Sequence, residues 1–161
     1  MLAIKVLTTD DWPLWREARL AALAEAPYAF GSRLADWQGD GDREERWRQR
    51  LGLAGSHNLI AVLDGVPAGM AAGMPGDEPG EAELISMWVA PKARGQRVGD
   101  TLINEIESWA RAAGYARLLL LVKPDNPAAI ALYERNGFAF VRRGSADEDG
   151  ERPMAKELPA S

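Results

Sequence analysis

The sequence contains no cysteine and only one histidine, His57. Without cysteine the chain can form no disulfide, no thiolate-ligated metal site and no cysteine nucleophile. A single histidine also excludes a metal site built from several histidines. The sequence therefore predicts no bound metal and a chemistry that depends on other side chains.

Positive charge is also scarce, since 24 acidic residues outnumber 19 basic ones and the net charge is −5. A general nucleic-acid binder gains affinity by neutralising phosphates, so this balance argues against a nucleic-acid partner. No apolar run reaches the ~18 residues of a membrane-spanning helix, and residues 1–6 lack the features of a signal peptide. We expect a cytoplasmic protein without a membrane partner.

The length of 161 residues favours one domain, residues 1–161. Apolar periodicity predicts helices over 11–25, 42–51, 98–113 and 126–135, and strands over 2–7, 59–63, 66–74, 82–90, 117–123, 138–143 and 152–158. Asp64-Gly65 indicates a tight hairpin between two of these strands. The order of the elements predicts a mixed α/β sheet.

Residues 89–99 read as a strand end, a glycine-bearing turn and a helix start, Val-Ala-Pro-Lys-Ala-Arg-Gly-Gln-Arg-Val-Gly. Unbonded N–H groups at a helix start, together with the positive end of the helix dipole, bind phosphate. The segment is neither a P-loop nor a dinucleotide-binding fingerprint, because both spacings are absent. The alternative is an ordinary strand-to-helix turn without a ligand.

Residues 126–138 form the second pattern, Asn-Pro-Ala-Ala-Ile-Ala-Leu-Tyr-Glu-Arg-Asn-Gly-Phe. Asn126 and Tyr133 are seven positions apart, which places them on nearly the same helix face about two turns apart. Taken singly, Asn126 also reads as a helix cap and Tyr133 as a half-buried core aromatic.

Together the two segments resemble the GCN5-related N-acetyltransferase (GNAT) superfamily. Its phosphate-binding pattern is Arg/Gln-x-x-Gly-x-Gly/Ala, and its later signature is Asn-x-x-Ala-x-x-Leu-Tyr-x-x-x-Gly-Phe. Arg94 and Gly99 match the first pattern, whereas Arg97 stands in place of its middle glycine. The resemblance implies a mostly antiparallel central sheet of about seven strands flanked by about four helices. It also implies acetyl-CoA as co-substrate and a primary amine as acceptor.

The resemblance assigns a role to each matched residue. The backbone at Val89 would pair with the pantetheine arm, residues 94–101 would hold the pyrophosphate, and Asn126 would hydrogen-bond the pantetheine. Tyr133 would protonate the leaving thiolate. The implied cofactor-binding residues are Trp88, Val89, Arg94, Gly95, Gln96, Arg97, Val98, Gly99, Asp100, Thr101, Asn126, Ala129 and Tyr133.

The acceptor amine must lose its proton before it attacks, because a lysine-like amine has a pKa near ~10.4. Glu83 is the candidate base, six residues before Val89 in a place where some family members carry a catalytic glutamate. Strand alternation predicts that Glu83, Ile85, Met87 and Val89 share one face. The alternative is that Glu83 is merely solvated at a strand start.

Two other functions compete with that of an active acetyltransferase. A catalytically silent acyl-CoA-binding regulatory module is kept open by Arg97, whereas the acidic balance disfavours a toxin that acts on charged tRNA. The loop bearing Asp147, Glu148, Asp149 and Glu151 favours an amine on a cationic or neutral molecule, with Tyr28 and Phe30 as an apolar wall. That loop also reads as plain solvated surface. A homodimer is left open.

Overall fold

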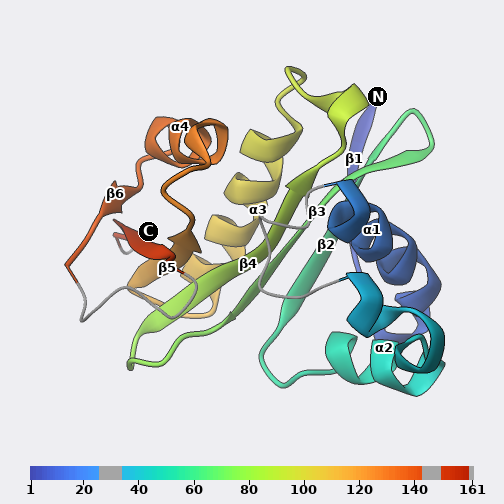
Figure 1. The fold of residues 1–161 in the computed structure, drawn as a ribbon. Helices are drawn as coiled ribbons and strands as arrows, with labels where there is room; N and C mark the ends of the chain where they lie inside the picture. The colour runs from blue at the N-terminus through green and yellow to red at the C-terminus, as the bar shows by residue number, and fades with distance from the viewer. Residues whose placement is uncertain (26–33, 143–149, 160–161) are drawn as a thin grey trace.

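The computed structural model describes residues 1–25, 34–142 and 150–159. Within them a seven-stranded sheet is covered by helices on both faces (Figure 1). The strands are β1 (Leu2–Val6), β2 (His57–Leu63), β3 (Val66–Pro75), β4 (Glu81–Val89), β5 (Arg117–Val122), β6 (Ala139–Phe140) and β7 (Arg152–Glu157). The helices are α1 (Trp12–Glu25), α2 (Glu44–Leu51), α3 (Val98–Ala112) and α4 (Pro127–Arg135), with short 3-10 turns at Thr9–Asp11, Leu34–Trp37, Gly39–Gly41 and Pro91–Ala93.

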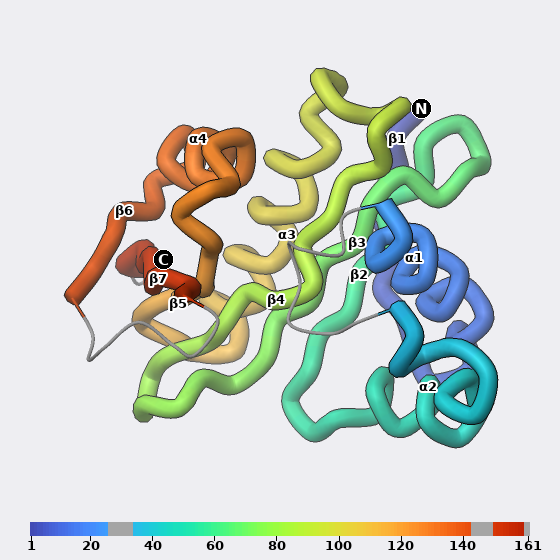
Figure 2. Tube along the Cα trace, in the orientation of Figure 1, coloured from blue at the N-terminus to red at the C-terminus, as the bar shows by residue number. Residues whose placement is uncertain are grey.

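The strand order is β1-β2-β3-β4-β5-β7-β6, and every neighbouring pair is antiparallel except β4 with β5. The predicted mixed, mostly antiparallel sheet is therefore confirmed. The parallel pair is short, because only Glu81–Glu83 of β4 pairs with Arg117–Leu119 of β5. Beyond these residues the two strands separate toward their C-terminal ends (Figure 2), which opens the middle of the sheet.

The sheet separates two hydrophobic cores, because alternate side chains of each strand point to opposite faces. In β2, Leu59 and Ala61 face the core under α3 and α4, whereas Ile60 faces the core under α1 and α2. Trp15 and Trp47 fill the second core and are fully buried. The α1–α2 face of the sheet is thus rich in aromatic side chains.

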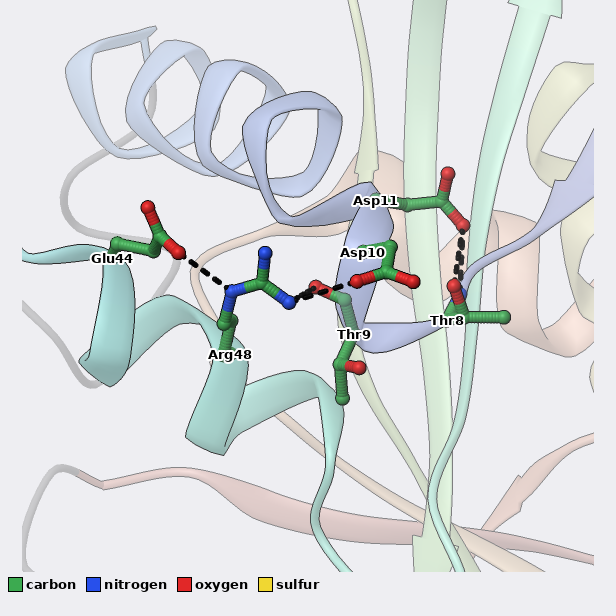
Figure 3. A network of polar contacts seen from close by, with 6 residues as sticks. All are labelled: Thr8, Thr9, Asp10, Asp11, Glu44 and Arg48. Carbon is green, nitrogen blue, oxygen red and sulfur yellow. Dashed lines mark hydrogen bonds and ion pairs between the residues drawn. The ribbon is translucent and has the colours of Figure 1, made fainter.

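Polar contacts fix the start of α1 against α2. The backbone N–H of Thr8 donates to Asp11 at 2.8 Å, and Arg48 of α2 donates to Asp10 and to Glu44, each at 2.9 Å (Figure 3). Both carboxylates that Arg48 contacts are exposed, so these ion pairs contribute little free energy and serve mainly to orient the two helices.

The alternation of β4 is interrupted by a bulge. Ile85 pairs with Ala72 and Trp88 pairs with Met70, so two residues of β4 lie opposite one residue of β3. Ser86 lies within the bulge and has a φ of 56°, a left-handed conformation that is uncommon outside glycine.

The bulge changes which side chains share a face. Ile85 packs against the core under α1 and α2, whereas Met87 and Val89 pack against the core under α3. The prediction that Glu83, Ile85, Met87 and Val89 share one face is therefore wrong, because strict alternation stops at the bulge. Glu83 and Ile85 remain together on the α1–α2 side, on the wall of a cavity.

Candidate functional site

A cavity of about 410 Å³ lies on the α1–α2 side of β4. Its volume is at the lower end of the range of about 300–1,000 Å³ found for small-molecule sites. Residues from α1, the 3-10 turn Leu34–Trp37, α2, β4, β5, α4 and the segment before β7 line it: Trp15, Arg19, Trp37, Trp47, Arg50, Glu83, Leu84, Ile85, Ser86, Met87, Leu121, Tyr133 and Glu151.

Tyr133 reaches this cavity from the other layer of the molecule. It belongs to α4, is 7% exposed and packs edge-on against Phe138, with ring centroids 6.0 Å apart. It nevertheless lines the cavity, which is consistent with the separation of β4 from β5. Burial, followed by the negative charge of Glu151, raises the pKa of the phenol. Tyr133 is therefore a protonated donor at neutral pH.

Glu83 lies on β4 just before the bulge and is half-buried. It lines the same cavity as Tyr133, and Glu151 brings a second carboxylate there. The structure thus brings together the two residues for which the sequence predicts catalytic roles. Two carboxylates and a protonated phenol around one cavity supply both proton acceptors and a proton donor.

The segment between β4 and α3 is an exposed turn with two left-handed residues, Gly95 at a φ of 83° and Arg97 at 63°. The backbone N–H groups of Gly95, Gln96 and Arg97 have no hydrogen-bond acceptor among the described residues. They precede the N-terminus of α3, where the helix dipole adds positive potential. The turn therefore has the properties of an anion site.

The family model of the acetyltransferase (GNAT) family matches residues 15–138. The chain belongs to this family. It is 38% identical over 97 residues to an IAA acetyltransferase of Azospirillum brasilense, covering 60% of this chain and 62% of that protein. It is 34% identical over 113 residues to a streptothricin acetyltransferase of Streptomyces lavendulae, covering 66% of this chain and 59% of that protein. The chain thus spans about three fifths of each relative's length.

The fold agrees with this family. The crystal structure of the PaiA N-acetyltransferase from Thermoplasma acidophilum in complex with coenzyme A superposes with a TM-score of 0.74. Sequence identity is 19%, and the match covers 98% of this chain and 99% of the other.

Within this GNAT chain, Arg94 and Trp88 are held by one carboxylate. Arg94 donates from Nη2 to Glu25 at 2.9 Å and from Nε to the carbonyl of Val89 at 3.2 Å. The indole of Trp88 is buried and donates to the other oxygen of Glu25 at 3.1 Å. The Trp88 side chain is therefore engaged inside the protein, and its contact with the cofactor stays a prediction.

Asp100 uses its side chain to join the two GNAT motifs. Its carboxylate accepts hydrogen bonds from Arg135 at 3.0 and 2.9 Å and from Asn136 at 2.9 Å. The hydrogen bonds from Arg135 are the largest cause of the lowered pKa of Asp100. Thr101 donates to the carbonyl of Arg97 at 2.8 Å and so closes the first turn of α3.

Gly99 joins the same two motifs by close packing. A Cβ added at this position would lie 3.0 Å from a methyl group of Leu132 in α4. The last glycine of the phosphate pattern thus allows α4 to approach α3. Val98 is buried beside it and belongs to the core, so its side chain does not face solvent.

Asn126 caps α4, because its Oδ1 accepts a hydrogen bond from the N–H of Ala129 at 3.3 Å. The helix-cap interpretation is confirmed, and the contact of Asn126 with pantetheine stays a prediction. Asp147, Glu148, Asp149, Tyr28 and Phe30 lie outside the described residues. Glu151, the acidic residue of this loop that the structure describes, lines the cavity.

The residues that α1 and α2 contribute to the cavity were not predicted from the sequence. Arg19 follows Trp15 by four positions and Arg50 follows Trp47 by three, so each basic residue shares a helix face with a buried tryptophan. A basic residue on the apolar stripe of an amphipathic helix was the available signal. Trp37 completes this wall of the cavity.

The described residues contain no cluster of histidine, aspartate and glutamate suited to hold a metal ion. None of their helices combines the length and apolar character needed to cross a membrane.

Proposed function

We propose that this protein is an acetyl-CoA-dependent N-acetyltransferase. It transfers an acetyl group to a primary amine of a small molecule or peptide by direct attack in a ternary complex. One observation carries the proposal: Tyr133 of α4 and Glu83 of β4 line a single cavity. The names of the relatives and the coenzyme A complex of a neighbouring fold support it.

The exposed turn before α3 fits the pyrophosphate of acetyl-CoA. Its N–H groups at Gly95, Gln96 and Arg97 have no described acceptor, and Lys92 and Arg94 add positive charge beside them. Backbone donors at a helix start bind phosphate whatever the side chains are. Arg97 is therefore compatible with this role, because its left-handed backbone reproduces the conformation that glycine adopts easily.

The proposed reaction needs one proton acceptor and one donor. Glu83 accepts a proton from the ammonium, either directly or through water, and the free amine then attacks the thioester carbonyl. A C–N bond forms and the C–S bond breaks. Tyr133 then protonates the departing thiolate, and the second proton of the acylated nitrogen returns to the Tyr133 phenolate through water, which restores the phenol. Its raised pKa keeps the proton in place until negative charge develops on sulfur.

Positioning of the two substrates contributes in addition to these side chains. The opening between β4 and β5 lets an acyl group held beside Tyr133 meet an amine held on the α1–α2 side. Bringing the reactants together in this way lowers the barrier, because their translational and rotational entropy is already lost on binding. A single domain, a cytoplasmic location, the lack of a nucleic-acid or membrane partner, and a homodimer stay predictions.

The test is a turnover assay with the purified protein, acetyl-CoA and a panel of primary amines. We expect thiol release that depends on the amine and an acetylated product of matching mass. Release without an acetylated amine would indicate hydrolysis. Tight binding of coenzyme A with no transfer to any amine would favour the silent acyl-CoA-binding module instead.

A further inference from the structure

Two arginines, Arg19 of α1 and Arg50 of α2, line the cavity and have no part in the proposed acetyl transfer. The guanidinium of Arg50 lies over the ring of Trp15, with Cζ 4.8 Å from the ring centroid. Its Nη1 donates to Oδ1 of Asn58 at 2.8 Å. The stacking and the hydrogen bond hold the guanidinium in one orientation.

Arg50 keeps an unused hydrogen-bond donor. Its Nη2 is buried, and among the described residues it has no hydrogen-bond partner. A buried donor of this kind is costly, and native proteins retain few of them. An oxygen of a bound ligand would satisfy it.

The two guanidinium groups also act on one another. Burial lowers the pKa of Arg19 to about 10, and burial together with the positive charge of Arg19 lowers the pKa of Arg50 to about 10. Both therefore remain cationic at neutral pH. Among the described groups, no carboxylate contributes to the shift of Arg50. A pair of partly desolvated like charges is stabilised when an anion binds between them.

The remaining lining of the cavity suits an apolar molecule that also carries an amine. The half-buried ring of Trp37 supplies aromatic surface and packs against the buried ring of Trp47, with centroids 4.6 Å apart at 34°. Glu83 and Glu151 line the same cavity and attract an ammonium group. One cavity of about 410 Å³ thus offers groups for an anion, an apolar body and a cation.

We propose that Arg19 and Arg50 form a subsite for the carboxylate of the acceptor, and that the acceptor is a free amino acid with an apolar or aromatic side chain. This proposal rests on the proposed acetyl transfer, because the amine of the same molecule is the group acetylated. Such a zwitterion is neutral overall, in line with the acceptor charge expected from sequence. Polyamines lack the carboxylate and are poor substrates.

The first test compares acceptors that differ only by a carboxylate: tryptophan with tryptamine, tyrosine with tyramine, and phenylalanine with phenethylamine. We expect kcat/KM of the preferred amino acid to exceed that of its amine by about tenfold or more, the effect of a charged hydrogen bond. Arg50→Gln should reduce this ratio to about threefold or less, because it lowers kcat/KM of the amino acid more than that of its amine. Arg43→Gln removes the same charge from an exposed position at the start of α2 that does not line the cavity, and it should preserve the ratio.

The second test measures binding without acetyl-CoA, by calorimetry with the same pairs. We expect the amino acid to bind more tightly than its amine, and Arg19→Gln and Arg50→Gln each to remove the difference. If the amino acid binds more tightly than its amine but is not acetylated, the subsite is supported and the proposed function is refuted. If every amine binds and reacts as well as its amino acid, the subsite is refuted while acetyl transfer stands. If Arg50→Gln fails to fold, Arg50→Lys and Arg19→Gln carry the comparison.

Discussion

Glu25, the last residue of α1, accepts a hydrogen bond from Arg94 at 2.9 Å and so joins α1 to the proposed pyrophosphate turn. The side chain of Arg94 is 53% exposed and that of Glu25 is 29% exposed. A pair this solvated is worth at most about 1 kcal/mol. A phosphate group can therefore compete with Glu25 for the guanidinium.

We predict that Glu25→Gln tightens the binding of coenzyme A by up to about fivefold, because the competing carboxylate is removed. Arg94→Gln should weaken binding, and high salt should reduce both effects. Calorimetric Kd values at two salt concentrations check this. Glu17→Gln removes a charge from an exposed position of the same helix and should leave the Kd unchanged. Weaker binding in Glu25→Gln would show that Glu25 positions Arg94 instead of competing for it.

Tyr133→Phe should lower kcat and leave the affinity for acetyl-CoA nearly unchanged, because the hydroxyl acts on charge that develops during the reaction. Proton donors typically contribute about 10²–10⁴-fold, and we expect the lower end because a thiolate leaves readily. Single-turnover rates separate chemistry from product release. Tyr115→Phe is the matched control, since Tyr115 packs on Trp109, with ring centroids 5.5 Å apart, and does not line the cavity. An unchanged single-turnover rate in Tyr133→Phe would remove the phenol from the mechanism.

Local sequence signals predicted much of the fold because they need no distant partner. Asp64 and Gly65 form the expected hairpin with φ of 52° and 83°, and Asn126 caps α4 as its position indicated. The β4 bulge at Ser86 was not predictable in this way. A bulge depends on the register of the neighbouring strand, and the β4 sequence alone reads as regular alternation.

The cavity was only half predictable. Tyr133 stands in the later GNAT signature and Glu83 at a position where some family members carry a glutamate, so the sequence predicted a role for each of them. Arg19 and Arg50 belong to two helices that meet only in the folded protein, and each reads singly as a solvated basic residue. The partner of Asp100 is likewise tertiary, because Arg135 follows it by 35 positions.

Arg97→Gly should stabilise the protein. A residue with a Cβ pays about 1–2 kcal/mol in the left-handed region, and glycine avoids this cost but loses more backbone entropy on folding. We expect the free energy of unfolding to rise by about 0.5–1 kcal/mol. In a protein of this size each kcal/mol raises Tm by about 2–4 °C. Arg97→Ala keeps the backbone cost and removes the charge, so it should not raise Tm. If Arg97→Gly and Arg97→Ala raised Tm equally, the loss of the arginine charge would explain the effect.

Asp42 should support stability above about pH 4 and lose that effect as the pH falls toward 2. Its carboxylate accepts hydrogen bonds from Arg16 of α1 and from Trp47 of α2, and these lower its pKa to about 2. A group whose pKa is lower in the folded state stabilises the fold above its unfolded pKa of about 3.9. Asp42→Asn should therefore lower Tm at pH 7, and its difference from the original protein should shrink between pH 4 and pH 2. Asp40→Asn alters an exposed neighbour and should leave Tm unchanged at either pH. A difference that stays constant down to pH 2 would mean that Asp42 contributes packing and not charge.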